Sequence, residues 1–168
     1  RGVGPGVPVG VALPRSTALV VALLSVLRAG GVLLPLDPAY PAARRAFILK
    51  DAGARLLLAD AVHAPPAVDA IEVLSVADWP APGTVATTVP TLPAPGAAAC
   101  LLYTSGSTGK PKGAIQPHGA LARRVAWMWA AYGFTRADVF SLRSSPNFID
   151  CYWEIFGALC HGAALVVV

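Results

Sequence analysis

Charged residues are scarce in this sequence: they make up 13% of its 168 residues, whereas 55% are hydrophobic. The net charge of +4 is small and the arginines are scattered, which argues against the basic stripe of a nucleic-acid-binding protein. Long hydrophobic runs are also missing. The longest apolar stretch, residues 16–27, is flanked by Arg15 and Arg28 and is too short to cross a bilayer. We therefore expect neither a nucleic-acid partner nor a membrane segment.

Cysteine is equally sparse. Cys100, Cys151 and Cys160 are odd in number and lack the spacing of metal ligands, so we expect reduced thiols and no metal site. The first residues also lack the basic, apolar and small-residue succession of a secretory signal peptide. These absences favour a cytoplasmic protein.

Both ends of the chain read as the interior of a longer sequence. Residues 1–10 are rich in Gly and Pro, and residues 164–168 have the pattern of a buried strand with nothing after it. The length of 168 residues suits a single domain. We expect residues 1–168 to form one partial domain, truncated at both ends.

Hydrophobic periodicity alternates between strand and helix in the first third of the chain. The expected elements are a strand at 7–13, a helix from Ser16 to Gly30, a strand at 32–36, a helix from Pro41 to Gly53 and a strand at 55–59. The second helix is expected to turn Phe47 inward and Arg44 and Arg45 outward. This alternation predicts an α/β fold in which helices pack on a parallel-rich sheet.

Residues 61–96 are rich in Pro and Ala, and we expect a loop region within the same domain, with one short strand at 71–76. The remaining expected elements are a strand at 97–102, a helix at 120–132, a strand at 140–143, a helix at 148–160 and a last strand at 164–168. In the helix at 120–132, Val125, Met128 and Trp129 are expected to be buried, while Arg123 and Arg124 face water.

The most informative stretch, Tyr103–Gly113, reads Y-T-S-G-S-T-G-K-P-K-G. Its glycines allow successive backbone N–H groups to point at one anion, and its hydroxyls and lysines add donors and positive charge. The residues that offer this chemistry are Thr104, Ser105, Gly106, Ser107, Thr108, Gly109, Lys110 and Lys112. The stretch is not a Walker A loop, because Pro111, Lys112 and Gly113 stand where that motif has Gly, Lys and a hydroxyl residue. A polar surface turn is the alternative to a polyphosphate site.

This stretch resembles the phosphate loop of the adenylate-forming enzymes, which include acyl- and aryl-CoA ligases and the adenylation domains of non-ribosomal peptide synthetases. Residues 27–41, which contain Leu-Asp-Pro-Ala-Tyr-Pro at Leu36–Pro41, are similar to a stretch of the peptide-synthetase branch. We interpret Leu36–Pro41 as a helix stop and a proline turn without chemistry of its own. The resemblance implies the partial N-terminal subdomain of an adenylate-forming enzyme.

Residues 147–156 resemble the family's F-D-x-S-x-W-E stretch, in which the Asp pairs with the ammonium group of an amino-acid substrate. Here Ile149 occupies the Asp position and Asp150 follows it, so the carboxylate is turned by about 100° on a helix. The resemblance implies that Ile149, Asp150 and Trp153 contact the substrate, and the shift suggests a β-amino acid such as β-alanine. An α-amino acid stays open, as does a purely structural role in which Asn147 caps the helix and Asp150 complements its dipole.

The implied function is that of a ligase of secondary metabolism: ATP-dependent activation of an amino acid as an acyl-adenylate. Thr104 and Lys112 would serve catalysis, and Thr104–Lys112 would hold the phosphates. The adenylate would then load the phosphopantetheine thiol of a peptidyl carrier protein beside neighbouring synthetase domains. Magnesium is implied with ATP, but its protein ligand is not expected in residues 1–168. The alternatives are an acyl- or aryl-CoA ligase and a catalytically incomplete nucleotide-binding fragment.

Overall fold

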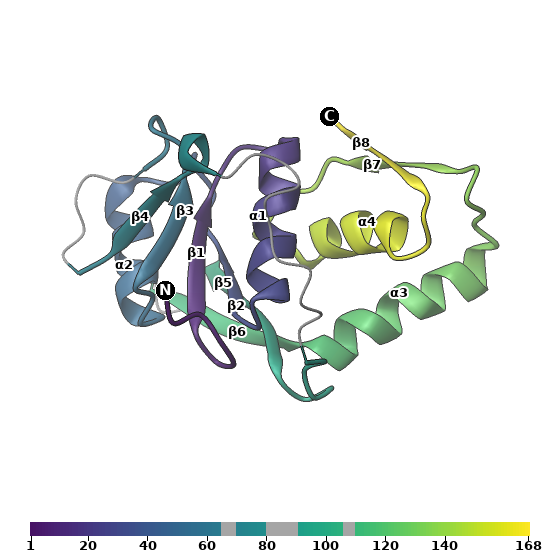
Figure 1. The fold of residues 1–168 in the computed structure, drawn as a ribbon, viewed down its shortest axis with the longest axis horizontal. Coiled ribbons are helices and arrows are strands. Elements are labelled where there is room, and N and C mark those ends of the chain that lie inside the picture. The colour runs from purple at the N-terminus through teal and green to yellow at the C-terminus, as the bar shows by residue number, and fades with distance from the viewer. Residues whose placement is uncertain (65–69, 80–90, 106–109) are drawn as a thin grey trace.

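A computed structural model describes residues 1–64, 70–79, 91–105 and 110–168 (Figure 1). Within these residues the main sheet has the strand order β4-β3-β1-β2-β5-β6. Its strands are β1 Pro8–Ala12, β2 Val32–Pro35, β3 Leu56–Ala59, β4 Glu72–Ser75, β5 Ala98–Ser105 and β6 Pro111–Pro117. Neighbours from β4 to β5 are parallel, and β6 is antiparallel to β5. The predicted α/β fold with a parallel-rich sheet is confirmed.

Two helices cover opposite faces of this sheet, α1 (Thr17–Arg28) and α2 (Ala42–Asp51) (Figure 1). Successive residues of the central strands alternate between them: on β3, Leu56 and Leu58 join the apolar cluster on the α1 side, while Leu57 joins that on the α2 side. Burial on both faces explains why β1, β2 and β3 are apolar throughout, whereas β4 and β6 at the two edges of the sheet are largely exposed.

The close packing of α2 depends on a glycine in the middle of β1. A Cβ atom added to Gly10 would lie 2.8 Å from Cδ1 of Leu57 and 2.9 Å from Cδ2 of Leu49 on α2. Both leucines are fully buried, so neither has free space to retreat into. Gly10 therefore lets this helix lie directly on the strands.

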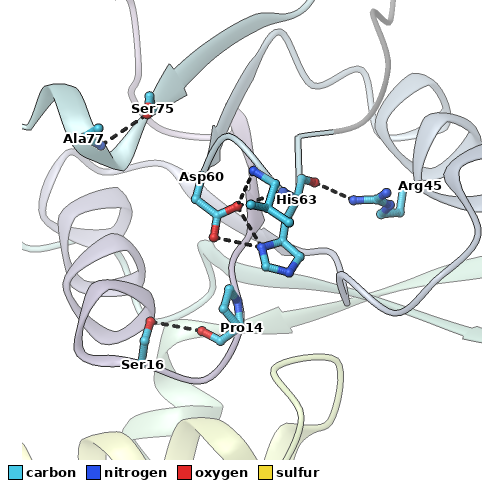
Figure 2. Close-up of polar contacts among 8 residues, drawn as sticks. Pro14, Ser16, Arg45, Asp60, His63, Ser75 and Ala77 are labelled. Atoms are coloured by element: carbon cyan, nitrogen blue, oxygen red, sulfur yellow. Dashed lines mark hydrogen bonds and ion pairs between the residues drawn. The ribbon is translucent and has the colours of Figure 1, made fainter.

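The expected helix positions hold, but the inward face of α2 was predicted wrongly. Arg45 is only 9% exposed and its guanidinium donates to the carbonyl of His63, whereas Phe47 is 37% exposed. Because residues 60–64 lie beside α2, the charged head of Arg45 reaches a backbone acceptor there while its apolar stem stays covered (Figure 2). By contrast, Ser16 caps α1 as predicted, since its Oγ accepts from the N–H of Leu19 at 3.1 Å.

The last part of the chain adds a second layer next to α1. Strands β7 (Val139–Leu142) and β8 (Ala164–Val167) pair in parallel, and α4 (Ile149–Leu159) and α3 (His118–Tyr132) pack beside them (Figure 1). Tyr152 and Ile155 of α4 are fully buried and share one apolar cluster with α1. This cluster holds the second layer against the main sheet.

Within residues 61–96 the short strand expected at 71–76 is present as β4, followed by a 3₁₀ turn at Val76–Asp78. The predicted loop character of the rest of this region falls largely on residues 65–69 and 80–90, which lie outside the described part. None of the described helices combines the length and the apolar character needed to span a membrane.

Candidate functional site

The described residues of the serine- and glycine-rich stretch, 103–105 and 110–113, lie at the adjoining ends of β5 and β6, which form a hairpin. In the antiparallel register Thr104 stands opposite Lys112, and Ser105 stands opposite Pro111. Directly opposed residues have Cβ atoms about 4.5–5.5 Å apart, so the Thr104 hydroxyl and the Lys112 stem leave the same face of the hairpin. Both side chains are exposed, as are Ser105 and Lys110. The hairpin thus gathers hydroxyl donors and two ammonium groups where β5 ends.

The other predicted members of this group, Gly106, Ser107, Thr108 and Gly109, lie outside the described residues. The strand β6 was not expected from the sequence, and it makes Lys112 part of a strand and not of a free loop. Pairing with β5 fixes the position of Lys112 along the strand relative to Thr104, which a free loop would not do.

Two contacts anchor the hairpin just before its turn. The buried Tyr103 donates from its hydroxyl to Oδ2 of Asp51 at the end of α2, at 2.6 Å. Burial, together with this hydrogen bond and the Asp51 charge, raises the pKa of Tyr103 far above its usual value. Opposite Tyr103, a Cβ on Gly113 would lie 2.9 Å from Cδ1 of Leu101 and 3.2 Å from Cζ of Tyr103. The tyrosine ring therefore needs a glycine at position 113.

A cavity of about 500 Å³ lies at the carboxyl edge of β1, β2 and β3, the edge at which β5 also ends. Its lining residues include Arg15, Asp37, His63 and Ser145. In open α/β sheets this edge is where ligands bind. The cavity and the β5–β6 hairpin thus belong to one side of the molecule.

Asp60 and His63 form a tight polar contact at this edge (Figure 2). Oδ1 of Asp60 accepts from the backbone N–H of His63 at 2.7 Å and from that of Val62 at 3.1 Å, and His63 Nδ1 lies 2.7 Å from it. Burial by itself raises the pKa of Asp60, but these hydrogen bonds outweigh burial and leave the pKa below its ordinary value. The carboxylate therefore stays charged and closes the turn after β3.

Asp150, the acidic residue predicted to bind the substrate, lies at a different cavity, next to α4. Asp150 and Trp153 line a space of about 540 Å³ together with Phe140, Arg143 and Glu154. Asp150 is exposed in the first turn of α4, where the helix dipole favours a negative charge. Ile149 lies beside it at the surface, with 36% exposure. A carboxylate so placed can receive a cation.

The alternative in which Asn147 caps α4 is wrong. The N-cap is Phe148, and no side chain makes a capping hydrogen bond there. Asn147 is 7% exposed and its amide is used elsewhere: oriented with its oxygen toward donors, it accepts from the N–H of Asp37 at 3.1 Å and donates to the carbonyl of Pro35 at 2.9 Å. The contact between Asp37 and Asn147 was not recognised from the sequence, because no local pattern signals a contact between residues so far apart in the chain.

The face of the Trp153 ring is covered by Arg124, which was expected to face water. The guanidinium carbon of Arg124 lies 4.1 Å from the Trp153 ring centroid and 4.6 Å from that of Trp127. Val125 and Met128 are buried as predicted, whereas Trp129 is only half-buried and donates from Nε1 to the Gly157 carbonyl at 2.6 Å. Arg124 therefore fixes the ring that borders the Asp150 cavity.

These features define an α/β fold with an anion-suited hairpin at the carboxyl edge of its main sheet and a separate acid-lined cavity between α3, β7 and α4. The family described as AMP-binding enzyme matches residues 1–168, and the chain belongs to this family.

Syringomycin synthase SyrB1 of Pseudomonas syringae pv. syringae is 40% identical over 170 residues, which cover 100% of this chain and 28% of that protein. A dimodular nonribosomal peptide synthase of Bacillus subtilis is 41% identical over 181 residues, which cover 100% of this chain and 8% of that protein. The chain thus spans less than a third of the length of these relatives.

The fold also matches solved structures of this kind. The crystal structure of the nonribosomal peptide synthetase FmoA3 gives a TM-score of 0.88 at 32% identity, with 99% of this chain and 18% of that chain covered. The N-terminal subdomain of Klebsiella oxytoca NpsA, in complex with 3-hydroxybenzoyl-AMSN, gives 0.83 at 30% identity, with 98% of this chain and 41% of that chain covered. The chain therefore has the fold of the N-terminal subdomain of peptide-synthetase adenylation domains.

Proposed function

We propose that residues 1–168 are part of an adenylation domain that activates an amino acid with ATP as an aminoacyl-adenylate. The observation that carries this proposal is the pairing of Thr104 with Lys112 across the β5–β6 hairpin, at the carboxyl end of a parallel strand. Membership of the AMP-binding enzyme family supports it. Further support comes from FmoA3, which has been solved in an AMPPNP-bound form and an α-methyl-L-serine-AMP-bound form.

In the proposed reaction a carboxylate oxygen of the amino acid attacks the α-phosphorus of ATP, and the bond from that phosphorus to the oxygen leading to the β-phosphate breaks. Pyrophosphate leaves with the bonding electron pair. The hydroxyls of Thr104 and Ser105 donate hydrogen bonds to phosphate oxygens, and the ammonium groups of Lys110 and Lys112 offset the charge that develops on pyrophosphate. Ser107, Thr108 and the backbone N–H groups of Gly106 and Gly109 complete the proposed cradle.

Magnesium would reach the site with the nucleotide. Across residues 1–64, 70–79, 91–105 and 110–168, no group of three or more His, Cys, Asp or Glu side chains is arranged to hold a metal ion. Magnesium prefers phosphate oxygens and water with one or two carboxylates. We therefore assign no ligand for it among these residues.

For the substrate we propose that Asp150 receives the ammonium group while Ile149 and Trp153 shape the pocket. The cavity that Asp150 lines favours this role, because an ammonium group that enters it can form a charge-assisted hydrogen bond with the carboxylate. The place of Asp150, one residue after the position usual in the family, favours a β-amino acid such as β-alanine over an α-amino acid. Transfer to a phosphopantetheine thiol of a peptidyl carrier protein, in a cytoplasmic multidomain synthetase, completes the proposal.

The extent of the domain is also part of this proposal. Residues 1–168 are a partial domain, and the Pro- and Ala-rich residues 61–96, which contribute β4 to the main sheet, belong to it. On this proposal the fragment alone does not complete the reaction, so the experiments below use the complete adenylation domain that contains it.

The test is substrate-dependent exchange of labelled pyrophosphate into ATP by the complete domain, with β-amino acids, α-amino acids and simple carboxylic acids as substrates. Exchange with an amino acid, lost in Asp150→Asn but kept in Asp138→Asn, is the expected result. Asp138 is the matched control because it lines the same cavity while its carboxylate accepts from the N–H of Thr135 at 2.6 Å. Exchange limited to acids without an amino group would contradict the proposal and place the domain with the CoA ligases.

A further inference from the structure

The segment that joins β7 to α4 is tied to the helix that follows it. Oε2 of Glu154 accepts from the N–H groups of Arg143 and Ser144 at 2.9 and 3.0 Å, and Oε1 accepts from the Ser144 hydroxyl at 2.7 Å. The fully buried Tyr152 donates to the carbonyl of Pro146 at 2.7 Å. The segment and the first two turns of α4 therefore move as one body.

A second set of contacts joins this segment to the main sheet. The Ser145 hydroxyl donates to Oδ2 of Asp37 at 3.0 Å across 108 residues of sequence. Asn147 bonds the backbone of Pro35 and Asp37, as described above. The other carboxylate oxygen of Asp37 accepts from the N–H of Ala39 at 2.9 Å, which fixes the carboxylate in its own turn. We call the contacts among Asp37, Ser145 and Asn147 the β2–α4 link.

The β2–α4 link lies between the two parts of the proposed active site. Asp37 follows β2, which pairs in parallel with β5 through Leu33 and Cys100, and β5 carries Thr104 near its end. On the other side, Asp150 comes three residues after Asn147. The link is a short, part-buried connection between the end of β2, which is the neighbour of β5 in the sheet, and the segment that leads into α4.

We propose that the β2–α4 link sets the distance between Asp150 and the β5–β6 hairpin, and thereby decides which amino-acid backbone the site activates. The inference rests on the proposed function. A β-amino acid differs from an α-amino acid by one additional carbon between ammonium and carboxylate, a bond length of about 1.5 Å. A misplacement of about 1 Å can cost a rate factor of about 100, so a small shift of α4 changes the preference between the two substrate classes.

Asp37, Ser145 and Asn147 are positioning residues in this proposal, since none of them needs to touch the substrate. Ser145 offers a direct perturbation because its hydroxyl is the side-chain donor to Asp37. Its removal also takes away the acceptor of the Asn147 N–H at 3.4 Å, but it leaves the Ala39 turn and the bonds of the Asn147 amide to Pro35 and Asp37 intact. Ser16→Ala is the matched control, because it also removes a serine hydrogen bond, the one at the start of α1.

The experiment measures kcat and KM for pyrophosphate exchange by the complete domain with its best β-amino acid and its best α-amino acid. We expect Ser145→Ala to raise the amino-acid KM and to reduce the selectivity ratio of kcat/KM between the two classes by at least threefold. The KM for ATP should stay within twofold of wild type. Ser145→Thr, which keeps the hydroxyl, should restore the ratio, and Ser16→Ala should leave it unchanged.

An unchanged selectivity ratio in Ser145→Ala, with a loss of thermal stability no different from that of Ser16→Ala, would overturn the proposed role of the β2–α4 link. A wild-type domain that exchanges with no amino acid would overturn the proposed function, and this inference with it. The wild-type measurement separates the two failures.

Discussion

Removing the ammonium group of Lys112 while keeping most of its apolar stem, as in Lys112→Met, tests whether the hairpin stabilises the departing pyrophosphate. The register places Lys112 directly opposite Thr104, so in the proposed function both side chains act on the same phosphate. A hydrogen bond from a charged group contributes about 1.5–3 kcal/mol. At about 1.4 kcal/mol for each factor of ten, we expect kcat/KM for adenylation to fall by about 10- to 150-fold.

Thr104→Val removes only a neutral hydroxyl, which contributes about 0.5–1.5 kcal/mol, so we expect a loss of about 2- to 12-fold. Because both groups act on one phosphate, the double variant should lose less than the product of the two single losses. The assay is exchange of labelled pyrophosphate into ATP by the complete domain, with thermal unfolding measured in parallel. Lys50→Met is the control, since Lys50 is an exposed lysine at the end of α2. Equal activities for Lys112→Met and Lys50→Met would refute the reasoning.

Three further predictions follow from the described contacts. Gly113→Val should lower the free energy of unfolding by about 1–3 kcal/mol, because the valine side chain would overlap Leu101 and Tyr103. The control variant Ala114→Val should be close to neutral in the same urea titration. Equal stabilities of the two variants would contradict the close packing at Gly113. Burial raises the pKa of Cys100 and Cys151 to about 12, so alkylation at pH 8 should modify the exposed Cys160 first, as detected by peptide mass mapping. Early labelling of either buried thiol would contradict the core described above. The pKa of Asp60 is lowered in the folded state, so its contact with His63 stabilises the fold at pH values above the ordinary pKa of 3.8, and this stabilisation is lost as the pH falls through the folded-state pKa. The difference in the free energy of unfolding between wild type and Asp60→Asn should therefore shrink from pH 6 to pH 2.5. A constant difference would contradict the assignment.

Local sequence signals predicted the features that depend on neighbouring residues. The Ser16 cap, the alternation of helix and strand, and the anion-suited stretch at 103–113 all follow from residue types and spacing within one or two turns of chain. The strand β6 was missed because Pro111 and Gly113 weaken any strand pattern, and pairing with β5 decides the outcome.

Contacts between distant parts of the chain were beyond such reasoning. Leu36–Pro41 was interpreted as a helix stop and a proline turn without chemistry of its own, and nothing in that pattern indicated that Asp37 bonds Ser145 at 3.0 Å. The burial of Arg45 likewise depends on residues 60–64, which supply the carbonyl of His63. In both cases the sheet order and the path of a loop determine which partner lies within reach, and local sequence patterns do not reveal either of them.

The most direct test of the proposed function follows the carboxylate oxygen of the amino acid. The complete domain is given ATP, hydroxylamine to capture the activated acid, and the amino acid that best supports exchange, labelled with ¹⁸O in its carboxyl group. Attack on the α-phosphorus leaves one ¹⁸O atom in the AMP that is released, and this is the result we predict. Label in inorganic phosphate, with ADP as the nucleotide product, would show attack on the γ-phosphorus and would contradict adenylate formation.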